Sequence, residues 1–126
     1  WQLTESGGQL NSTVFTGIEI LNGGSDVDDF ILTSSTTSVT QINGGGGVNS
    51  LAAFDQANSW TLNAVASTLN DTLQFDNIAK LVGGAGNDTF RIMDFDVGDI
   101  ETLDGGGGEN RLVGGQDSSV FNNTCK

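Results

Sequence analysis

The run "LVGGAGNDTF" at residues 81–90 holds the residues of this chain best suited to bind a metal ion. Its glycines open a tight turn and expose the carbonyl oxygens of the backbone, and Asp88 adds a carboxylate. Calcium prefers six to eight oxygen ligands, which turn carbonyls and a carboxylate can supply. The threonine and phenylalanine that follow indicate the start of a strand. The run therefore predicts either a calcium-binding turn or a corner in which Asp88 caps its own backbone.

Related turns recur along the chain and supply the other candidate ligands of a metal ion. Asn49 and Asn110 stand where Asp88 stands in its own turn, and an amide oxygen can bind calcium but brings no charge. Those two turns are predicted to be weaker sites, and asparagines stacked as a ladder along the fold are the alternative. The complete set is Asp88 with Gly83, Gly84 and Gly86, Asp28 with Gly23 and Gly24, Asp71, Asn49, and Asn110 with Gly105 and Gly107.

The turn "GGAGNDTFR", which begins at Gly83, resembles the nonapeptide of the RTX, or hemolysin-type, calcium-binding family. The family pattern is G-G-x-G-x-D-x-U-x, where U is a large apolar residue, and this turn matches every specified position. The resemblance implies a parallel β-roll in which neighbouring turns share calcium, as in repeat modules of large bacterial surface and adhesin proteins. The other turns depart from the pattern, since Asp26 replaces a glycine and the turn at Ala66 has lost its glycines. Fewer calcium ions than turns are therefore expected.

Composition restricts the partners of the chain. Its 126 residues fit a single domain, and 16 acidic residues against 4 basic ones give a net charge of −12. This charge argues against nucleic acid and anionic membrane surfaces as partners, and it favours calcium as a partner that neutralises the repulsion. No run approaches the ~18 apolar residues of a membrane span, so no membrane insertion is expected. The single cysteine, Cys125, excludes an internal disulfide.

Self-comparison divides the chain into two copies of a unit of about 60 residues. Residues 10–32 align with 69–92, and residues 41–51 align with 102–112. Unit one is placed at 1–59 and unit two at 60–119, with 120–126 as a tail or the start of a further unit. Each unit divides again into segments of about 20 residues. Short β-type stretches and glycine corners at this period are typical of a solenoid.

These repeats predict an all-β fold, a parallel β-solenoid or β-roll of about six coils in one domain. Apolar residues that follow the turns are expected to stack in a single internal column, formed by Phe30, Leu51, Leu73, Phe90 and Leu112. A second column is expected from Ile18, Val39, Ile78 and Ile100. The phrase I-x-x-L before the turns does not have the period of two of a strand, so a bend or bulge is predicted there.

The function predicted from the sequence is that of a calcium-binding structural module of a secreted or cell-surface protein, which becomes rigid when calcium binds outside the cell. One alternative is a subunit of an extracellular fibre, in which neighbouring repeats or identical subunits stack end to end through uncapped strands. A second alternative is a module that binds polysaccharide or ice. The chain has no histidine and shows neither a nucleophile–base pair nor a phosphate loop, so it is not expected to be an enzyme.

Overall fold

The computed structural model describes residues 1–64, 66–93, 97 and 99–114, and within them it is all-β with no helix. The predicted tail at 120–126, Cys125 and most of the acidic run at 94–99 lie outside the described residues. The strands are β1 (Gln2–Leu3), β2 (Gly7–Leu10), β3 (Thr13–Thr16), β4 (Ile20–Asn22), β5 (Asp29–Leu32), β6 (Gln41–Asn43), β7 (Ser50–Ala52), β8 (Ser59–Leu62), β9 (Ser67–Leu69), β10 (Leu73–Asp76), β11 (Lys80–Val82), β12 (Thr89–Ile92), β13 (Thr102–Asp104) and β14 (Arg111–Val113).

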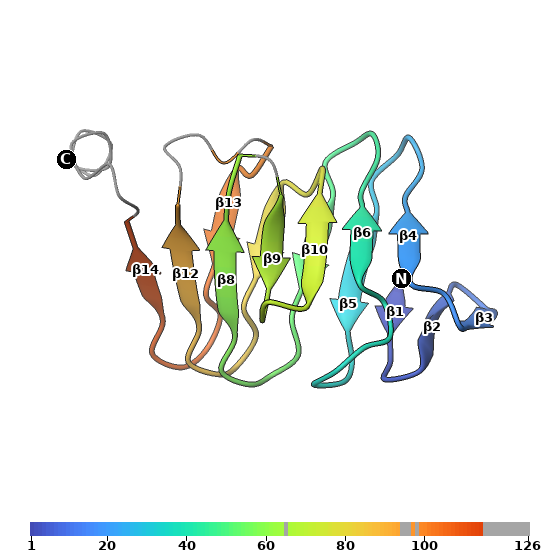
Figure 1. Cartoon of the computed structure of the whole chain (residues 1–126), viewed down its shortest axis with the longest axis horizontal. Helices are drawn as coiled ribbons and strands as arrows, with labels where there is room; N and C mark the ends of the chain where they lie inside the picture. The colour runs from blue at the N-terminus through green and yellow to red at the C-terminus, as the bar shows by residue number, and fades with distance from the viewer. Residues whose placement is uncertain (65, 94–96, 98, 115–126) are drawn as a thin grey trace.

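The strands form two seven-stranded sheets that lie one behind the other in Figure 1. The first sheet has the order β13-β11-β7-β5-β1-β2-β3, and the second has the order β14-β12-β8-β9-β10-β6-β4. From β3 to β8, and again from β10 to β14, each connection carries the chain from one sheet to the other. No described helix is long and apolar enough to cross a membrane.

Both sheets are mixed, so the prediction of an all-β fold is confirmed but the strands are not all parallel. The antiparallel pairs are β1 with β2, β2 with β3, β8 with β9, and β9 with β10. After β7 the chain enters the second sheet at β8, and the antiparallel strands β9 and β10 then lie between β8 and β6. A short connection between neighbouring strands of one sheet has to be antiparallel, which explains the departure from a purely parallel coil.

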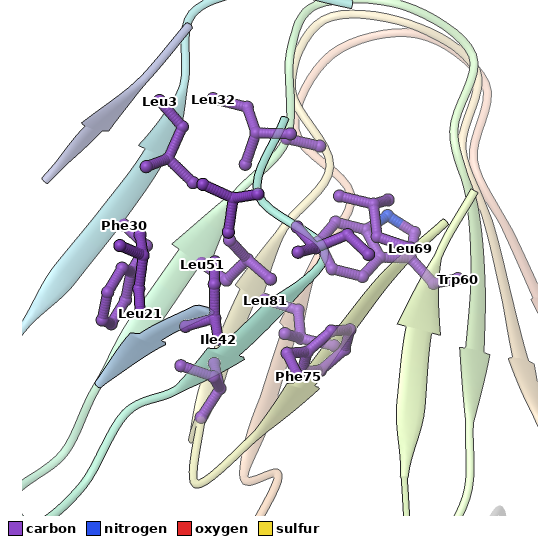
Figure 2. Packing of buried hydrophobic residues seen from close by; sticks show 14 of the residues in the cluster. Leu3, Leu21, Phe30, Leu32, Ile42, Leu51, Trp60, Leu69, Phe75 and Leu81 are labelled. Carbon is purple, nitrogen blue, oxygen red and sulfur yellow. The ribbon is translucent and has the colours of Figure 1, made fainter. Parts of the chain in front are cut away.

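The core lies between the sheets and takes apolar side chains from both. Strands alternate buried and exposed positions, as in the buried, exposed order of Phe30 and Ile31 in β5, because successive side chains point to opposite faces. Figure 2 shows this packing around Leu51 and Leu81. The core consists of Leu3, Leu21, Phe30, Leu32, Val39, Ile42, Leu51, Ala53, Trp60, Leu62, Leu69, Leu73, Phe75, Ile78, Ala79, Leu81 and Phe90.

The two sequence repeats have the same strand pairing but occupy exchanged sheets. In unit one β1 pairs with β2 and β5, β2 with β3, β5 with β7, and β4 with β6. In unit two β8 pairs with β9 and β12, β9 with β10, β12 with β14, and β11 with β13. Strands β1, β2, β3, β5 and β7 lie in the first sheet, whereas β8, β9, β10, β12 and β14 lie in the second. Unit two therefore repeats unit one with the roles of the sheets reversed.

Aromatic contacts repeat with the strands. Trp1 stacks on Phe30 with ring centroids 5.4 Å apart, and its counterpart Trp60 stacks on Phe90 at 5.5 Å. The same tryptophans also make edge-on contacts. The ring centroids of Trp1 and Phe15 are 6.2 Å apart, and those of Trp60 and Phe75 are 5.8 Å apart. Trp1 and Trp60 thus occupy equivalent packing sites in the two units.

The expectation of one internal column is wrong, because the sheets exchange between units. Phe30 and Leu51 lie side by side in the first sheet, and the next neighbours in that row are Leu81 and Leu103. Phe90 pairs instead with Trp60 and Leu112 in the second sheet. Residues that follow turns in unit one therefore stack on residues of the I-x-x-L phrase in unit two.

The I-x-x-L phrase, for which a bend or bulge is predicted, has a bend. The carbonyl oxygen of Glu19 accepts hydrogen bonds from both Thr40 and Gln41, at 2.8 and 3.1 Å. The carbonyl oxygen of Asn49 likewise accepts from Ala79 and Lys80. Two successive N–H groups that share one carbonyl oxygen indicate a bend in the phrase, and the pairing of the strands stays in step, with Ile20 opposite Gln41.

Trp60 is fully buried, so we expect Trp60→Ala to lower the free energy of unfolding by about 3–5 kcal/mol. The loss has two parts, the apolar surface removed from the core and the cavity that remains beside Phe90. Urea denaturation followed by circular dichroism measures it. The control is Val27→Ala at an exposed position, which should change the free energy by no more than about 0.5 kcal/mol.

Candidate functional site

The predicted metal turns lie on two opposite sides of the fold. We call each of these sides, a row of turns that connect the two sheets, an edge. Turns 23–28 and 44–49 precede strands of the first sheet, and turns 83–88 and 105–110 precede strands of the second sheet. In Figure 1 the first pair lies at the top and the second pair at the bottom. Turns of one unit therefore stack on each other, whereas Asp28 and Asp88, which are equivalent in sequence, are at opposite edges.

At the first edge, Asp28, Asn49 and Asn77 form a row that we call the first ladder. The N–H of Asp28 donates to Oδ1 of Asn49 at 2.8 Å. The Nδ2 group of Asn49 donates to the carbonyl oxygen of Gly46 in its own turn at 3.1 Å, and to that of Asn77 in the next turn at 3.0 Å. Asn49 is 0% exposed, so its amide satisfies backbone groups that water cannot reach.

At the second edge, Asn58, Asp88 and Asn110 form an equivalent row, the second ladder. The N–H of Asn58 donates to Oδ1 of Asp88 at 3.0 Å, and the N–H of Asp88 donates to Oδ1 of Asn110 at 2.9 Å. The Nδ2 group of Asn58 donates to the carbonyl oxygen of Gly83 in the next turn at 3.1 Å. Each ladder thus joins successive turns through side-chain oxygens and amide hydrogens.

The second ladder is interrupted at Asp88. A Cβ atom built on Gly83 would overlap Oδ2 of Asp88 and would lie 2.8 Å from the carbonyl oxygen of Gly105, so both oxygens lie beside Gly83. At the corresponding places, Asn49 bridges to Asn77 and Asn58 bridges to Gly83 through an N–H group. A carboxylate has no hydrogen to donate. Asp88 therefore places a second acceptor where Asn49 and Asn58 place a donor, and Asp28 does the same beside the carbonyl oxygen of Gly44 at the first edge.

Oδ2 of Asp88 is buried and has no hydrogen-bond partner among the described residues, and the whole residue is 1% exposed. Burial raises the pKa of the Asp88 carboxyl group above its ordinary value of 3.8, although the hydrogen bonds from Asn58 act in the opposite direction. The nearby charge of Asp55 raises the pKa further. An ionised carboxylate here needs a proton, a hydrogen-bond donor or a cation.

Both carboxylate oxygens of Asp28, unlike those of Asp88, have hydrogen-bond donors. It is half-buried, its Oδ2 accepts the N–H of Gly24 at 2.9 Å, and its Oδ1 accepts Nε1 of Trp1 at 3.2 Å. Nε1 of Trp60, the counterpart of Trp1, is buried without a partner among the described residues. The indole of Trp60 is thus a candidate donor for Asp88, and a test of metal binding has to separate it from a cation.

The glycines of the Asp88 turn fit close stacking of turns. A Cβ atom on Gly86 would overlap the backbone of Gln56 in the adjacent turn. Gly84 has a φ of +99°, a conformation that side chains other than hydrogen rarely adopt. In the same turn, the N–H of Ala85 donates to Oδ1 of Asp55 at 2.9 Å. Among the other candidates, Gly23 and Gly105 lie under ladder side chains, whereas Gly24 and Gly107 have open or ordinary surroundings.

Sequence reasoning missed Asn58 and Asp55, because turn 53–58 has no glycine. The available signal was spacing: Asn58 stands two residues before Trp60, as Asp88 stands two residues before Phe90. Asp71 lies apart from both ladders. It is exposed in the hairpin loop between β9 and β10 and has a φ of 58°.

Among the described residues, no cluster of three or more acidic, histidine or cysteine side chains could hold a metal ion. A cation at Asp88 would thus rely on one carboxylate and on backbone carbonyl oxygens. Comparison of the chain with family models, curated proteins and solved structures found no match.

We expect Asn49→Ala to lower the free energy of unfolding by roughly 3 kcal/mol, because it leaves the N–H of Asp28 and two carbonyl groups without partners. Asn110→Ala is the matched control. Asn110 has the same position in its turn but is exposed, so water replaces the lost bonds and about 1 kcal/mol or less is expected. Equal losses in chemical denaturation would contradict the burial-dependent role of the ladder.

The raised pKa of Asp88 makes stability depend on pH in a defined direction. The folded state holds the proton of Asp88 more tightly than the unfolded state, so in a chelator this group stabilises the fold at low pH. Its contribution is lost as the pH rises from about 3.8 through the pKa of the folded state. The difference in free energy of unfolding between wild type and Asp88→Asn, measured from pH 4 to 8, isolates this effect. A difference that does not change with pH would be inconsistent with the burial of Asp88.

Proposed function

We propose that the chain is a calcium-binding structural repeat module of a secreted or cell-surface protein. Its fold is a β-roll in which a parallel two-sheet coil is interrupted once per unit by an antiparallel hairpin. The observation that supports calcium most directly is Oδ2 of Asp88, which is buried without a hydrogen-bond partner among the described residues and lies beside Gly83, as the carbonyl oxygen of Gly105 does. The RTX-like pattern of the same turn agrees with this proposal.

The calcium ligands proposed are Oδ2 of Asp88 and the carbonyl oxygen of Gly105, with other carbonyl groups of the stacked turns completing the set. Calcium accepts such oxygen-rich, irregular ligand sets, whereas magnesium requires a near-ideal octahedron and keeps several waters. The carboxylate is already desolvated, so a divalent cation would recover its lost electrostatic stabilisation. Asp28 and Asp71 would contribute less, because the first already has two donors and the second is exposed in a hairpin.

The proposed mechanism is thermodynamic linkage between calcium and folding. The ligands come from turns 83–88 and 105–110, which are adjacent only when the coil is formed, so calcium binds the folded chain in preference to the unfolded one. At a calcium concentration about 100 times the Kd, this preference adds about 2.7 kcal/mol to the free energy of unfolding. Calcium also reduces the repulsion within a chain of net charge −12.

We expect calcium to raise the Tm of the wild-type protein, after chelation, by roughly 10 °C at saturation, and magnesium to have little effect. In Asp88→Asn the calcium-dependent rise should disappear. The Tm of this variant in chelator should exceed that of wild type, because an amide can donate to Gly105 and complete the ladder. Thermal melts followed by circular dichroism provide both values.

Two further variants test whether the response to calcium depends on Asp88 itself, rather than on another carboxylate or on the indole of Trp60. Asp28→Asn removes a carboxylate of the same type at the other edge and should keep the wild-type response. Trp60→Phe removes the indole N–H that is the candidate donor to Asp88. This variant should also keep the wild-type response to calcium. A wild-type Tm that calcium leaves unchanged, or a response that survives Asp88→Asn, would overturn the proposal.

A further inference from the structure

The junction between the two units supplies a template for contact between two chains. There, β6 of unit one pairs with β10 of unit two, and β7 pairs with β11, both in parallel. These are the pairings that join the units to each other, and they lie on both sheets. The counterparts of β10 and β11 are β3 and β4, which form one end of the sheets, and the counterparts of β6 and β7 are β13 and β14, which form the other end.

We infer that a second copy of this chain docks end to end on the first, with β3 and β4 of one copy pairing in parallel with β13 and β14 of the other. The internal register predicts the external one. Phe75 lies opposite Ile42 inside the chain, so Phe15 should lie opposite Leu103 of the second copy. Leu81 lies opposite Leu51, so Leu21 should lie opposite Leu112.

Burial at the internal junction shows what the ends lack. Ile78 is 1% exposed at the junction, whereas its counterpart Ile18 is 40% exposed at the β4 end. Leu51 is 0% exposed, whereas its counterpart Leu112 is 51% exposed at the β14 end. The ends therefore carry the same residue types that the junction buries, and a second copy would bury them in equivalent surroundings.

The backbone at the ends has the shape that the junction requires. At the junction, the N–H of Gly44 donates to the carbonyl oxygen of Asp76 at 2.9 Å, and Nδ2 of Asn49 donates to the carbonyl oxygen of Asn77. Asn77 has a φ of 55°, and its counterpart Gly17 has a φ of 66°. The carbonyl oxygen of Gly17 is thus the counterpart acceptor for Nδ2 of Asn110, which is exposed at the opposite end.

We expect the wild-type chain to associate reversibly as its concentration rises, at 150 mM salt, in sedimentation velocity experiments. Ile18→Lys and Leu112→Lys should each weaken association by about tenfold or more, since each buries a charge at the centre of the new contact. Both positions are exposed in the single chain, so the variants should keep the wild-type circular dichroism spectrum. Val27→Lys, at an exposed turn position, is the matched control and should associate as wild type does.

Cross-linking tests the register itself. Asn43 lies opposite Asp76 at the junction, which places Asp104 opposite Thr16 of the second copy. In a Cys125→Ser background, Thr16→Cys with Asp104→Cys should yield a series of multimers with a short thiol cross-linker. The control Thr16→Cys with Ile31→Cys carries two exposed thiols that the proposed contact keeps apart, and it should remain monomeric.

Three results would overturn this inference. The first is a monomer at every concentration up to about 100 μM, at which a contact with a Kd of about 1 μM would be nearly saturated. This result together with a lower Tm for Leu112→Lys would instead indicate that residues 115–126 of the same chain cover this end. The second is association that both lysine variants leave unchanged, and the third is equal cross-linking of the two thiol pairs. These experiments are run in chelator, so a failure of calcium binding would not affect this test.

Discussion

The exchange of sheets between successive units is the constraint on which the rest of the structure depends. Each unit crosses between the sheets at the connections from β3 to β4, β4 to β5, β5 to β6, β6 to β7, and β7 to the next unit. This number is odd, so the next unit begins in the opposite sheet. The exchange places Trp1 and Trp60 in different sheets, and it places the turns of Asp28 and Asp88 at different edges. It also makes the two ends of the molecule complementary.

The ladders show how neutral side chains can close such a coil. Tight turns that stack on each other leave buried backbone groups, and each of these needs a partner. Asparagine suits this task because its amide accepts from one turn and donates to another, as Asn49 does. Aspartate can only accept when it is ionised. Both oxygens of Asp28 have donors, whereas Oδ2 of Asp88 has none among the described residues, so this rung of the second ladder depends on a proton, an indole donor or a cation.

The sequence was sufficient for the all-β class, a bend in the I-x-x-L phrase and the asparagine ladder as an alternative interpretation of Asn49 and Asn110. It did not predict the sheet exchange, because a period of 60 residues carries no information about how many crossings lie within it. The expected column through Phe30, Leu51 and Phe90 failed for this reason. Asn58 was missed because its turn keeps the spacing but not the glycines, and Asp71 was aligned with the ladder turns although it lies in a hairpin loop.

The sheet exchange has a consequence for how a longer assembly would present itself to another molecule. Each sheet gains seven strands over two units, which at about 4.8 Å per strand corresponds to a rise of roughly 34 Å. Successive units would face opposite directions, because each unit is related to the next by about half a turn around the axis of the rod. A receptor that recognised one edge would meet its epitope only on every second unit, and two receptors on opposite flanks would be offset by half that rise. Such a rod would have two flanks of the same backbone architecture, which differ in the side chains that the two units place on them.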